Sequence, residues 1–502
     1  MARRAGLLLV WTVGLAGPAA GQDLDLAGIE AAVERARDEF VVPGVALAVV
    51  RGEELLWARG FGVCALDGPP VDPHTSFGVA SNSKAFTAAL LGMAMDEGLL
   101  TYDDRIVDHR PDFQMFDPWV TREARLRDFL CHRSGLPQFG GDCLWIGNAL
   151  SSDEVFDRLR YLEPSAPFRA RFQYNNLGWM VAGKVLEKVR GQSWADEVRA
   201  RILEPLGMDR TDTSWRQLGD RDNVATPYEM RGGVLVAKPY DDMDPVAAAG
   251  ALHSTVLDMS RWMSLNLGGG EYAGSRLISA DRLREMQSVQ MALPVSPEVE
   301  QRRGTHFAGY GLGWGLSDYR GYKVVTHGGG LTGMISRQLL IPEIGMGVVV
   351  LTNRAPNPMT TALCYHVVDD WLGTVEKDWV GEAIETHRRG LQQAQEAEDR
   401  RRIERTLGTQ PASAPSDYAG SYHNKMAGDA QVRLEDGHLV FDYNRRHLGD
   451  LVHWHYETFQ VTWRDPIFDM PEKSFLTFER DAEGAITGLK VRFYHVQEFE
   501  RR

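Results

Sequence analysis

Two β-hairpin patterns, separated by a long and mostly helical stretch, most strongly constrain the fold of this 502-residue chain. The first joins residues 45–50 and 55–60, and the second joins residues 336–341 and 346–351, each through a turn that contains a glycine. The last of these strands is apolar enough to be buried on both faces. The order strands, helices, strands indicates an α+β fold, in which both ends of a domain build one antiparallel sheet flanked by helices.

Between the two hairpins the sequence pattern is helical. Residues 82–97 and 177–190 are two clear examples, and Gly98 and Gly191 stand just beyond them, where a helix often ends in a left-handed residue. Strands and helices do not alternate here, and no G-x-x-x-x-G-K-[ST] phosphate loop occurs. We therefore expect an all-helical subdomain beside the sheet and no repeated βαβ unit.

The length predicts a second domain, because single hydrophobic cores stop growing near about 250 to 300 residues. Residues 376–415 are charged and helical at first and then rich in proline and serine, which is typical of a linker. Residues 416–502 carry short alternating runs, with turns such as Asp436-Gly437 between them. We assign residues 22–375 to the first domain and residues 416–502 to a small C-terminal all-β barrel or sandwich.

The N-terminus has the features of an export signal. Arg3 and Arg4 precede an apolar stretch over residues 7–16, and small residues follow at 19–21. A membrane anchor is the alternative, but the stretch is shorter than the ~20 residues that a spanning helix needs. We expect residues 1–21 to be a cleaved signal peptide. The mature chain would then be periplasmic or secreted, with no membrane span.

Charge and cysteine content limit the possible partners. Asp and Glu number 69 against 55 Lys and Arg, so the net charge is −14. The electrostatic field of this negative charge repels the phosphate backbones of nucleic acids, and we expect no nucleic-acid partner. Four cysteines are too few for a disulfide scaffold. Cys131 and Cys143 could form a bridge after export or remain buried thiols, and the sequence leaves both open.

Ser81 and Lys84 form an S-x-x-K pattern at the start of the first helix. Residues three apart share one helical face, so the two side chains can meet. Burial would lower the pKa of the Lys84 ammonium toward neutrality, and the free amine could then take the proton of the Ser81 hydroxyl. The alternative is an N-cap serine beside a solvated lysine, which the pattern alone leaves open.

Two later segments carry further candidates. Tyr174 and Asn176 stand directly before the second helix, and we expect the charge of Lys84 to ease ionisation of the tyrosine, so that it shares the general-base work. His327 is followed by Gly328 and Gly329 at the end of a predicted strand. Glycines there let a substrate backbone lie close and expose a main-chain N–H to a developing oxyanion.

Taken together, the three motifs resemble those of the serine β-lactamase and penicillin-recognising peptidase family, in its branch of class C β-lactamases, D-aminopeptidases and esterases. Family enzymes carry S-x-x-K, Y-x-N and a K-T-G-like triplet in this order. The resemblance covers roughly residues 25–370 and extends to framework segments at 131–137, 248–255 and 310–314. It implies a transpeptidase-like sheet with a helical subdomain and a lipocalin-like C-terminal barrel.

The resemblance also implies roles for single residues. Ser81 would be the acylated nucleophile, with Lys84 and Tyr174 as the proton-transfer pair. The substrate-binding residues would be Asn176, which bonds the substrate amide, together with His327 and Gly329. The backbone N–H groups of Ser81 and Gly330 would form the oxyanion hole.

His327 departs from the usual pattern, because typical β-lactamases and transpeptidases have a lysine there. A histidine is mostly neutral at pH 7, which weakens the case for efficient β-lactam hydrolysis. A histidine at this position is similar to the D-aminopeptidase and esterase members of the family. The presence of Asn176 favours amide substrates. A structural histidine at a strand end is the alternative role.

Several aromatic and histidine residues receive structural interpretations. His453 and His455 do not complete a zinc motif, and we interpret them as barrel residues. His132 is expected to belong to the framework. Trp145 and Trp314 could line the cleft, although large aromatic side chains are more often found in a core.

We therefore predict an exported serine hydrolase that cleaves amide, peptide or ester bonds of a small-molecule or peptide substrate through an acyl-enzyme at Ser81, without a cofactor or metal. One alternative is a β-lactamase or penicillin-binding DD-peptidase. Another is a binding protein on a degenerate hydrolase fold. The C-terminal domain is expected to shape or gate the cleft, and the sequence leaves the oligomeric state open.

Overall fold

The structure is a computed structural model that describes residues 23–374, 377–444, 447–465, 468, 473–493 and 495–502. The predicted signal peptide lies outside the described residues. Within these ranges, none of the helices combines the length and the apolar character that crossing a membrane requires.

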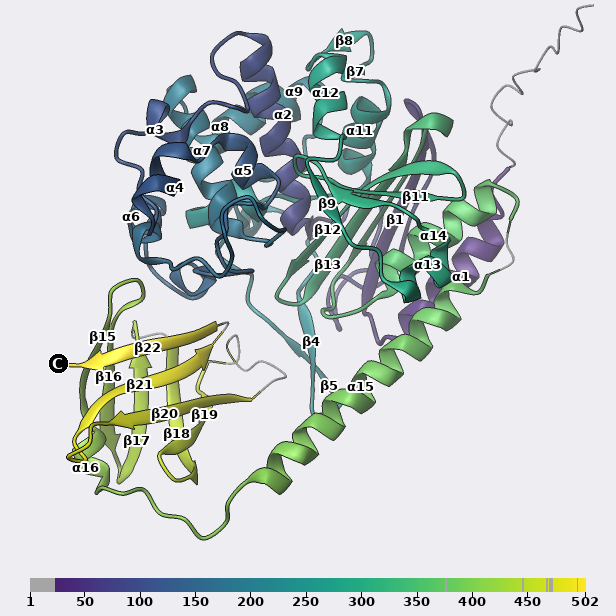
Figure 1. The fold of residues 1–502 in the computed structure, drawn as a ribbon. Coiled ribbons are helices and arrows are strands. Elements are labelled where there is room, and N and C mark those ends of the chain that lie inside the picture. Colours follow the sequence, from purple (N-terminus) through teal and green to yellow (C-terminus); the bar gives the residue numbers. More distant parts are fainter. Residues whose placement is uncertain (1–22, 375–376, 445–446, 466–467, 469–472, 494) are drawn as a thin grey trace, which may run out of the picture.

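An eight-stranded antiparallel sheet forms the centre of the first domain (Figure 1). Its strands, in spatial order, are β2 (Glu54–Gly62), β1 (Gly44–Arg51), β14 (Met346–Thr352), β13 (Met334–Ile341), β12 (Tyr322–Leu331), β11 (Gly315–Tyr319), β10 (Ala308–Tyr310) and β9 (Met291–Leu293). The two predicted hairpins are β1–β2 and β13–β14. Because β1 pairs with β14 from Val45↔Thr352 to Arg51↔Met346, the two ends of the domain meet inside one sheet, as predicted.

Helices cover both faces of the sheet. α1 (Leu26–Glu39) and α14 (Met359–Trp371) lie on one face, and α2 (Ser83–Asp96) and α11 (Val256–Leu267) lie on the other. The side chains of β1 alternate between the two cores: Val45, Leu47 and Val49 pack toward α1 and α14, whereas Ala46 and Ala48 pack toward α2 and α11. Burial on both faces explains why this strand is uniformly apolar.

A helical subdomain covers one end of the sheet. It contains α3 (Ile106–His109), α4 (Pro118–Glu123), α5 (Leu126–Leu130), α6 (Ser152–Arg158), α7 (Asn176–Arg190), α8 (Trp194–Val198) and α9 (Glu204–Leu206). The Asn175 side chain caps α7 by accepting from the N–H of Gly178, and Gly191 ends it with φ of 69°. This cap holds the residues just before α7 in a fixed position.

Short elements complete the domain. They are β3 (Phe77–Gly78), β4 (Tyr228–Arg231), β5 (Val234–Ala237), α10 (Ala247–Gly250), β6 (His253–Ser254), β7 (Glu271–Tyr272), β8 (Ser275–Arg276), α12 (Ala280–Met286) and α13 (Pro297–Arg303). β3 pairs with β6 immediately before the Ser81 segment and ties that segment to α10 and α11.

The C-terminal strands close into an eight-stranded antiparallel barrel. In order they are β15 (Gly420–Asn424), β16 (Gly428–Glu435), β17 (His438–Tyr443), β18 (His447–His455), β19 (Thr458–Trp463), β20 (Ser474–Arg480), β21 (Ile486–Phe493) and β22 (His495–Arg501), preceded by α16 (Pro415–Tyr418). β22 pairs with β15 and closes the ring. Asp436 and Gly437 both have positive φ in the turn between β16 and β17, which suits a tight hairpin. The predicted all-β barrel is confirmed.

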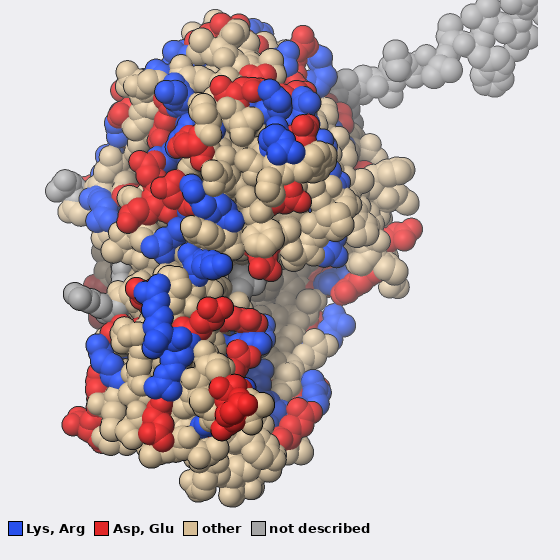
Figure 2. Space-filling view, turned by 60° about the vertical axis from the view of Figure 1, so that its left-hand side comes forward, with Lys and Arg blue, Asp and Glu red and all other residues tan. Residues whose placement is uncertain are grey.

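The long helix α15 (Trp379–Glu404) lies within the predicted linker and runs from the sheet toward the barrel (Figure 1). The barrel rests against the helical subdomain. Arg158 Nη1 donates to the carbonyl oxygens of Met426 and Ala427, each at 3.0 Å. The surface that Figure 2 presents has acidic and basic side chains interspersed over both parts.

Candidate active site

Ser81 and Lys84 meet at the start of α2, as predicted. Ser81 lies in the 3-10 turn Ala80–Asn82 that leads into the helix, and Ala80 has φ of 51°, which residues with side chains rarely adopt. The Lys84 Nζ is 3.0 Å from the Ser81 Oγ, and the lysine is fully buried. The alternative of a solvated lysine is therefore wrong.

The Lys84 amine is surrounded by acceptors. Besides Ser81, it contacts Asn176 Oδ1 at 2.9 Å and the carbonyl oxygen of Ala249 at 2.8 Å. Burial lowers the pKa of Lys84 to about 7, and the Asp142 carboxylate acts in the opposite direction. Near neutral pH a large fraction of the amine is therefore free to accept a proton.

Tyr174 stands two residues before α7 and reaches the same point. The Ser81 side chain acts on the Tyr174 hydroxyl in the direction of a lower pKa, and the Tyr174 ring centroid is 4.9 Å from the Lys84 Nζ. Burial raises the pKa of Tyr174 above its ordinary value. The expectation that Lys84 eases ionisation of Tyr174 is wrong, because desolvation of the tyrosinate dominates. Tyr174 is thus a neutral hydroxyl that can relay a proton.

Asn176 connects Lys84 to a residue that the sequence analysis did not single out, Asp142. The Asn176 Nδ2 donates to Asp142 Oδ2 at 3.0 Å, and Trp145 Nε1 donates to Asp142 Oδ1 at 3.0 Å. Burial raises the pKa of Asp142 to about 7. The one signal in the sequence is a carboxylate in an otherwise largely apolar stretch, and this is too common to identify a site.

The glycines after His327 let β12 lie directly against the turn that holds Ser81. A Cβ on Gly329 would lie 2.1 Å from the carbonyl oxygen of Val79 and 2.4 Å from Ser336 Oγ, so only glycine fits. Gly330 is exposed at the end of the strand, and a Cβ there would have Ile335 Cδ1 as its nearest neighbour at 3.5 Å. The triplet therefore brings a strand edge to the nucleophile.

His327 is engaged inside the protein through both ring nitrogens. Nδ1 is 2.7 Å from the carbonyl oxygen of Gly328, so it carries the hydrogen, and Nε2 accepts from the Tyr310 hydroxyl at 2.8 Å. Burial lowers the pKa of His327 to about 3, and the nearby Lys84 adds to this effect. His327 is a neutral side chain here, and Tyr310 was identified beforehand only as part of a framework segment.

His132 supports the tyrosine, in agreement with its predicted framework role. Its ring stacks on Tyr174 with centroids 4.2 Å apart, and its Nδ1 accepts from the N–H of Asn175 at 3.0 Å. Burial lowers the pKa of His132 well below the ordinary value. The histidine is therefore a neutral support for the segment that carries Tyr174 and Asn176.

The remaining candidates lie elsewhere. His453 and His455 are on β18, where each contacts a backbone group of a neighbouring turn. Trp314 is fully buried in the core. Among the described residues, no three His, Cys, Asp or Glu side chains are placed to hold a metal ion. The four cysteines are buried free thiols, so the structure contains no Cys131–Cys143 bridge.

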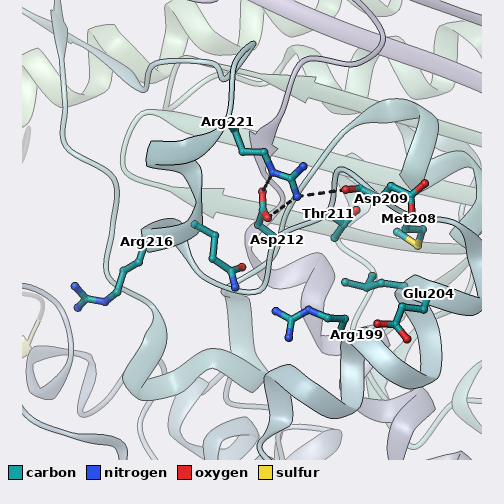
Figure 3. Close-up of a pocket in the computed structure, with 10 residues that line it drawn as sticks. Arg199, Glu204, Met208, Asp209, Thr211, Asp212, Arg216 and Arg221 are labelled. Carbon is teal, nitrogen blue, oxygen red and sulfur yellow. Dashed lines mark hydrogen bonds and ion pairs between the residues drawn. The ribbon is translucent and has the colours of Figure 1, made fainter.

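A separate charged pocket of about 520 Å³ contains none of these residues (Figure 3). It is lined in part by Arg199, Glu204, Arg216 and Arg221. Arg221 pairs with Asp212 at 2.9 Å, one of the interactions that Figure 3 marks. The pocket therefore remains distinct from the Ser81 centre.

Comparison with known proteins identifies the family. The beta-lactamase family model matches residues 29–370, and a domain of unknown function, DUF3471, matches residues 404–501. The chain belongs to the beta-lactamase family, with homologues that are named as penicillin-binding proteins and hydrolases.

Among the curated relatives, Unguisins hydrolase ungD' of Aspergillus campestris is 30% identical over 362 residues, which are 68% of this chain and 64% of that protein. Unguisins hydrolase ungD of Aspergillus violaceofuscus is 29% identical, over 67% of this chain and 63% of that protein. The chain thus spans less than two thirds of both fungal proteins. Penicillin-binding protein 4 of Amycolatopsis lactamdurans is 29% identical over 63% of this chain and 82% of its own length.

A solved structure is similar in fold along nearly the whole chain. The octameric penicillin-binding protein homologue from Pyrococcus abyssi superposes with a TM-score of 0.64 at 21% identity, covering 95% of this chain and 100% of that one. At this identity the likeness concerns the fold alone. The superposed region of this chain includes both the sheet with its helices and the barrel.

Proposed function

We propose that this protein is a serine hydrolase that cleaves amide or ester bonds through an acyl-enzyme at Ser81. The observation that carries the proposal is the buried Lys84 Nζ, 3.0 Å from the Ser81 Oγ and with a pKa near 7. A serine hydroxyl is a weak nucleophile without an adjacent base, and an uncharged amine one helical turn away supplies that base. The relatives named as hydrolases agree with this class of reaction.

The proposed reaction begins when Ser81 Oγ attacks the carbonyl carbon and its proton passes to the neutral Lys84 amine. The carbonyl oxygen becomes an oxyanion, which the backbone N–H groups of Ser81 and Gly330 would stabilise. Collapse of this intermediate breaks the bond to the leaving nitrogen or oxygen. That atom takes a proton from Tyr174, which recovers one from the Lys84 ammonium. Water then repeats the sequence on the Ser81 ester and releases the acid.

We propose that the substrate's acyl group carries no carboxylate, because a carboxylate would need a fixed positive charge in the site. His327 stands where related β-lactamases have lysine, and its nitrogens are already bonded to Tyr310 and Gly328. Burial lowers the pKa of His327 to about 3, so it supplies no cation at neutral pH. This favours neutral amides, D-amino-acid amides or esters over β-lactams. A β-lactamase or DD-peptidase activity is the second candidate, favoured by the relative named Penicillin-binding protein 4.

A substrate panel tests the proposal. Purified protein and Ser81→Ala would be assayed with a D-amino-acid amide, a short acyl ester and a chromogenic cephalosporin. Hydrolysis of the amide or ester that is lost in Ser81→Ala is expected. Faster turnover of the cephalosporin would show that the role given to His327 is incorrect. An unmodified Ser81 in mass spectra after fluorophosphonate treatment would instead support a binding protein.

We also propose export through residues 1–21 and a role for the barrel in shaping the cleft. The barrel touches the loop that carries Asp142, because Asn148 donates to the Tyr443 hydroxyl and Phe468 packs on the backbone of Gly147. Edman sequencing of the secreted or periplasmic protein tests the signal. Truncation near Gly408 tests the barrel, and an unchanged substrate range would exclude that role.

A further inference from the structure

Asp142 is a buried carboxyl group whose two oxygens face two different donors. Only 5% of the residue is exposed. Oδ1 accepts from the Trp145 indole and Oδ2 from the Asn176 amide, both at 3.0 Å. A buried acidic group is retained only when such bonds compensate its desolvation. This arrangement therefore calls for an explanation beyond packing.

The bond to Asp142 fixes which way the Asn176 amide points. In its ionised form the Asp142 carboxyl group can only accept, so the Nδ2 side of Asn176 must face it. The amide oxygen is then turned to Lys84, where it lies 2.9 Å from Nζ. Rotation of the amide by half a turn would place N–H against the Lys84 N–H groups and remove one acceptor of the amine.

We propose that Asp142 is a positioning residue that holds the Asn176 amide in one orientation and thereby aims the Lys84 amine at Ser81. The inference rests on the proposed serine hydrolase function. Asp142 itself does not touch the reacting atoms, and it acts through Asn176.

The loop that carries Asp142 is held by its own backbone and by a contact with the barrel. Asp142 begins the 3-10 turn Asp142–Leu144, and the N–H of Ile146 bonds back to the Asp142 carbonyl at 3.0 Å. Further along, Asn148 Nδ2 contacts the Cys143 carbonyl oxygen and the Tyr443 hydroxyl of the barrel, both at 3.4 Å. These contacts give the carboxyl group a fixed origin from which to orient Asn176.

The charge of Asp142 has a second effect that can be measured. The titratable groups that respond to it are Lys84 on α2, Tyr174 before α7 and Cys143 on its own turn. The carboxylate stabilises the ammonium form of Lys84 and opposes ionisation of the other two. Loss of the carboxylate therefore lowers the pKa of Lys84, and the form that activates Ser81 persists to lower pH.

The experiment measures the rate of Ser81 labelling by a fluorophosphonate from pH 5 to 9 in the full-length protein. In Asp142→Asn, the new NH2 group must face the N–H of either Trp145 or Asn176, so one of the two bonds is lost. We expect the plateau rate to fall by up to about tenfold and the midpoint of the pH profile to move to lower pH. Trp145→Phe removes one bond that favours the anion, so it should move the midpoint less, in the same direction. Asp258→Asn changes another buried carboxylate and should keep the wild-type midpoint.

The outcomes separate this proposal from the proposed function. Absence of Ser81 labelling in the wild type overturns both. Labelling of the wild type together with a folded Asp142→Asn that keeps its rate and midpoint overturns only the role of Asp142. If circular dichroism shows that Asp142→Asn does not fold, Trp145→Phe decides, and an unchanged midpoint in that variant overturns the proposal.

Discussion

Tyr310 donates its phenolic hydrogen to Nε2 of His327 across 2.8 Å, and burial keeps this imidazole neutral. Tyr310→Phe leaves a buried nitrogen without its donor, so we expect a loss of about 1 to 3 kcal/mol in the free energy of unfolding. Urea unfolding of the two proteins measures this loss. Equal midpoints and slopes would contradict the assigned bond.

The rate of acylation should rise with pH through the pKa of Lys84. Burial lowers that pKa to about 7, and the amine must be unprotonated to accept the Ser81 proton. With an ester that has no ionisable group, kcat/KM is expected to increase from pH 5 to a plateau above pH 8. His132 and His327 should not contribute, because burial lowers the pKa of both. A flat profile would rule out Lys84 as the base.

The same lysine should make stability depend on pH. Its pKa is about 7 in the folded state and ~10.4 in the unfolded chain, so the unfolded state binds more protons between these values. The free energy of unfolding is therefore expected to rise with pH over this window, by at most about 1.4 kcal/mol per pH unit from this residue. Lys84→Met should lack this part of the slope. Urea unfolding at a series of pH values measures this. If the free energy of unfolding changed with pH equally in both proteins, the lowered pKa of Lys84 would be refuted.

Gly329→Ala should disrupt the contact between β12 and the nucleophile turn. The added Cβ would lie 2.1 Å from the Val79 carbonyl oxygen, so strand or turn must move. Displacements of about 1 Å at such sites cost about a hundredfold in rate, which kcat/KM measures. Gly390→Ala on α15 is the control, since no atom lies within 4 Å of its added Cβ. Wild-type activity in Gly329→Ala would contradict the packing.

Arg158→Ala should loosen the barrel. The guanidinium makes two 3.0 Å bonds to the carbonyl oxygens of Met426 and Ala427. We expect faster proteolysis of the linker and a KM that rises more for a long peptide substrate than for a short ester. Limited trypsin digestion and the two KM values check this. Identical digestion rates would mean that this contact does not hold the barrel.

The parts of the fold that follow from local pattern were predictable. The hairpins β1–β2 and β13–β14 have clear strand periodicity, and α7 begins at Asn176, one residue from the predicted start. The short strands β11, β10 and β9, which extend the sheet beyond β12 to its edge at β9, were not predicted. They have three to five residues each and form only because the neighbouring strands offer hydrogen bonds.

The same distinction holds for the site, where contacts between near neighbours in the sequence were predictable and contacts between distant residues were not. Ser81 and Lys84 are three residues apart, so helical geometry alone brings them together. Asp142 and Asn176 are 34 residues apart, and their contact depends on how a loop packs against α7. The wrong expectation for Tyr174 has a related cause, since burial depends on the whole tertiary structure. Sequence spacing reveals neighbours along a helix, whereas desolvation and loop contacts need coordinates.

Closure of the barrel depends on the last strand, β22, which pairs with both β21 and β15. A chain that ends before His495 would leave two neighbouring strands with unpaired N–H and C=O groups. Such edges are templates for pairing with other chains. Strand β22 thus covers two strand edges at once, and a deletion that removes it should be judged first by solubility and only then by activity.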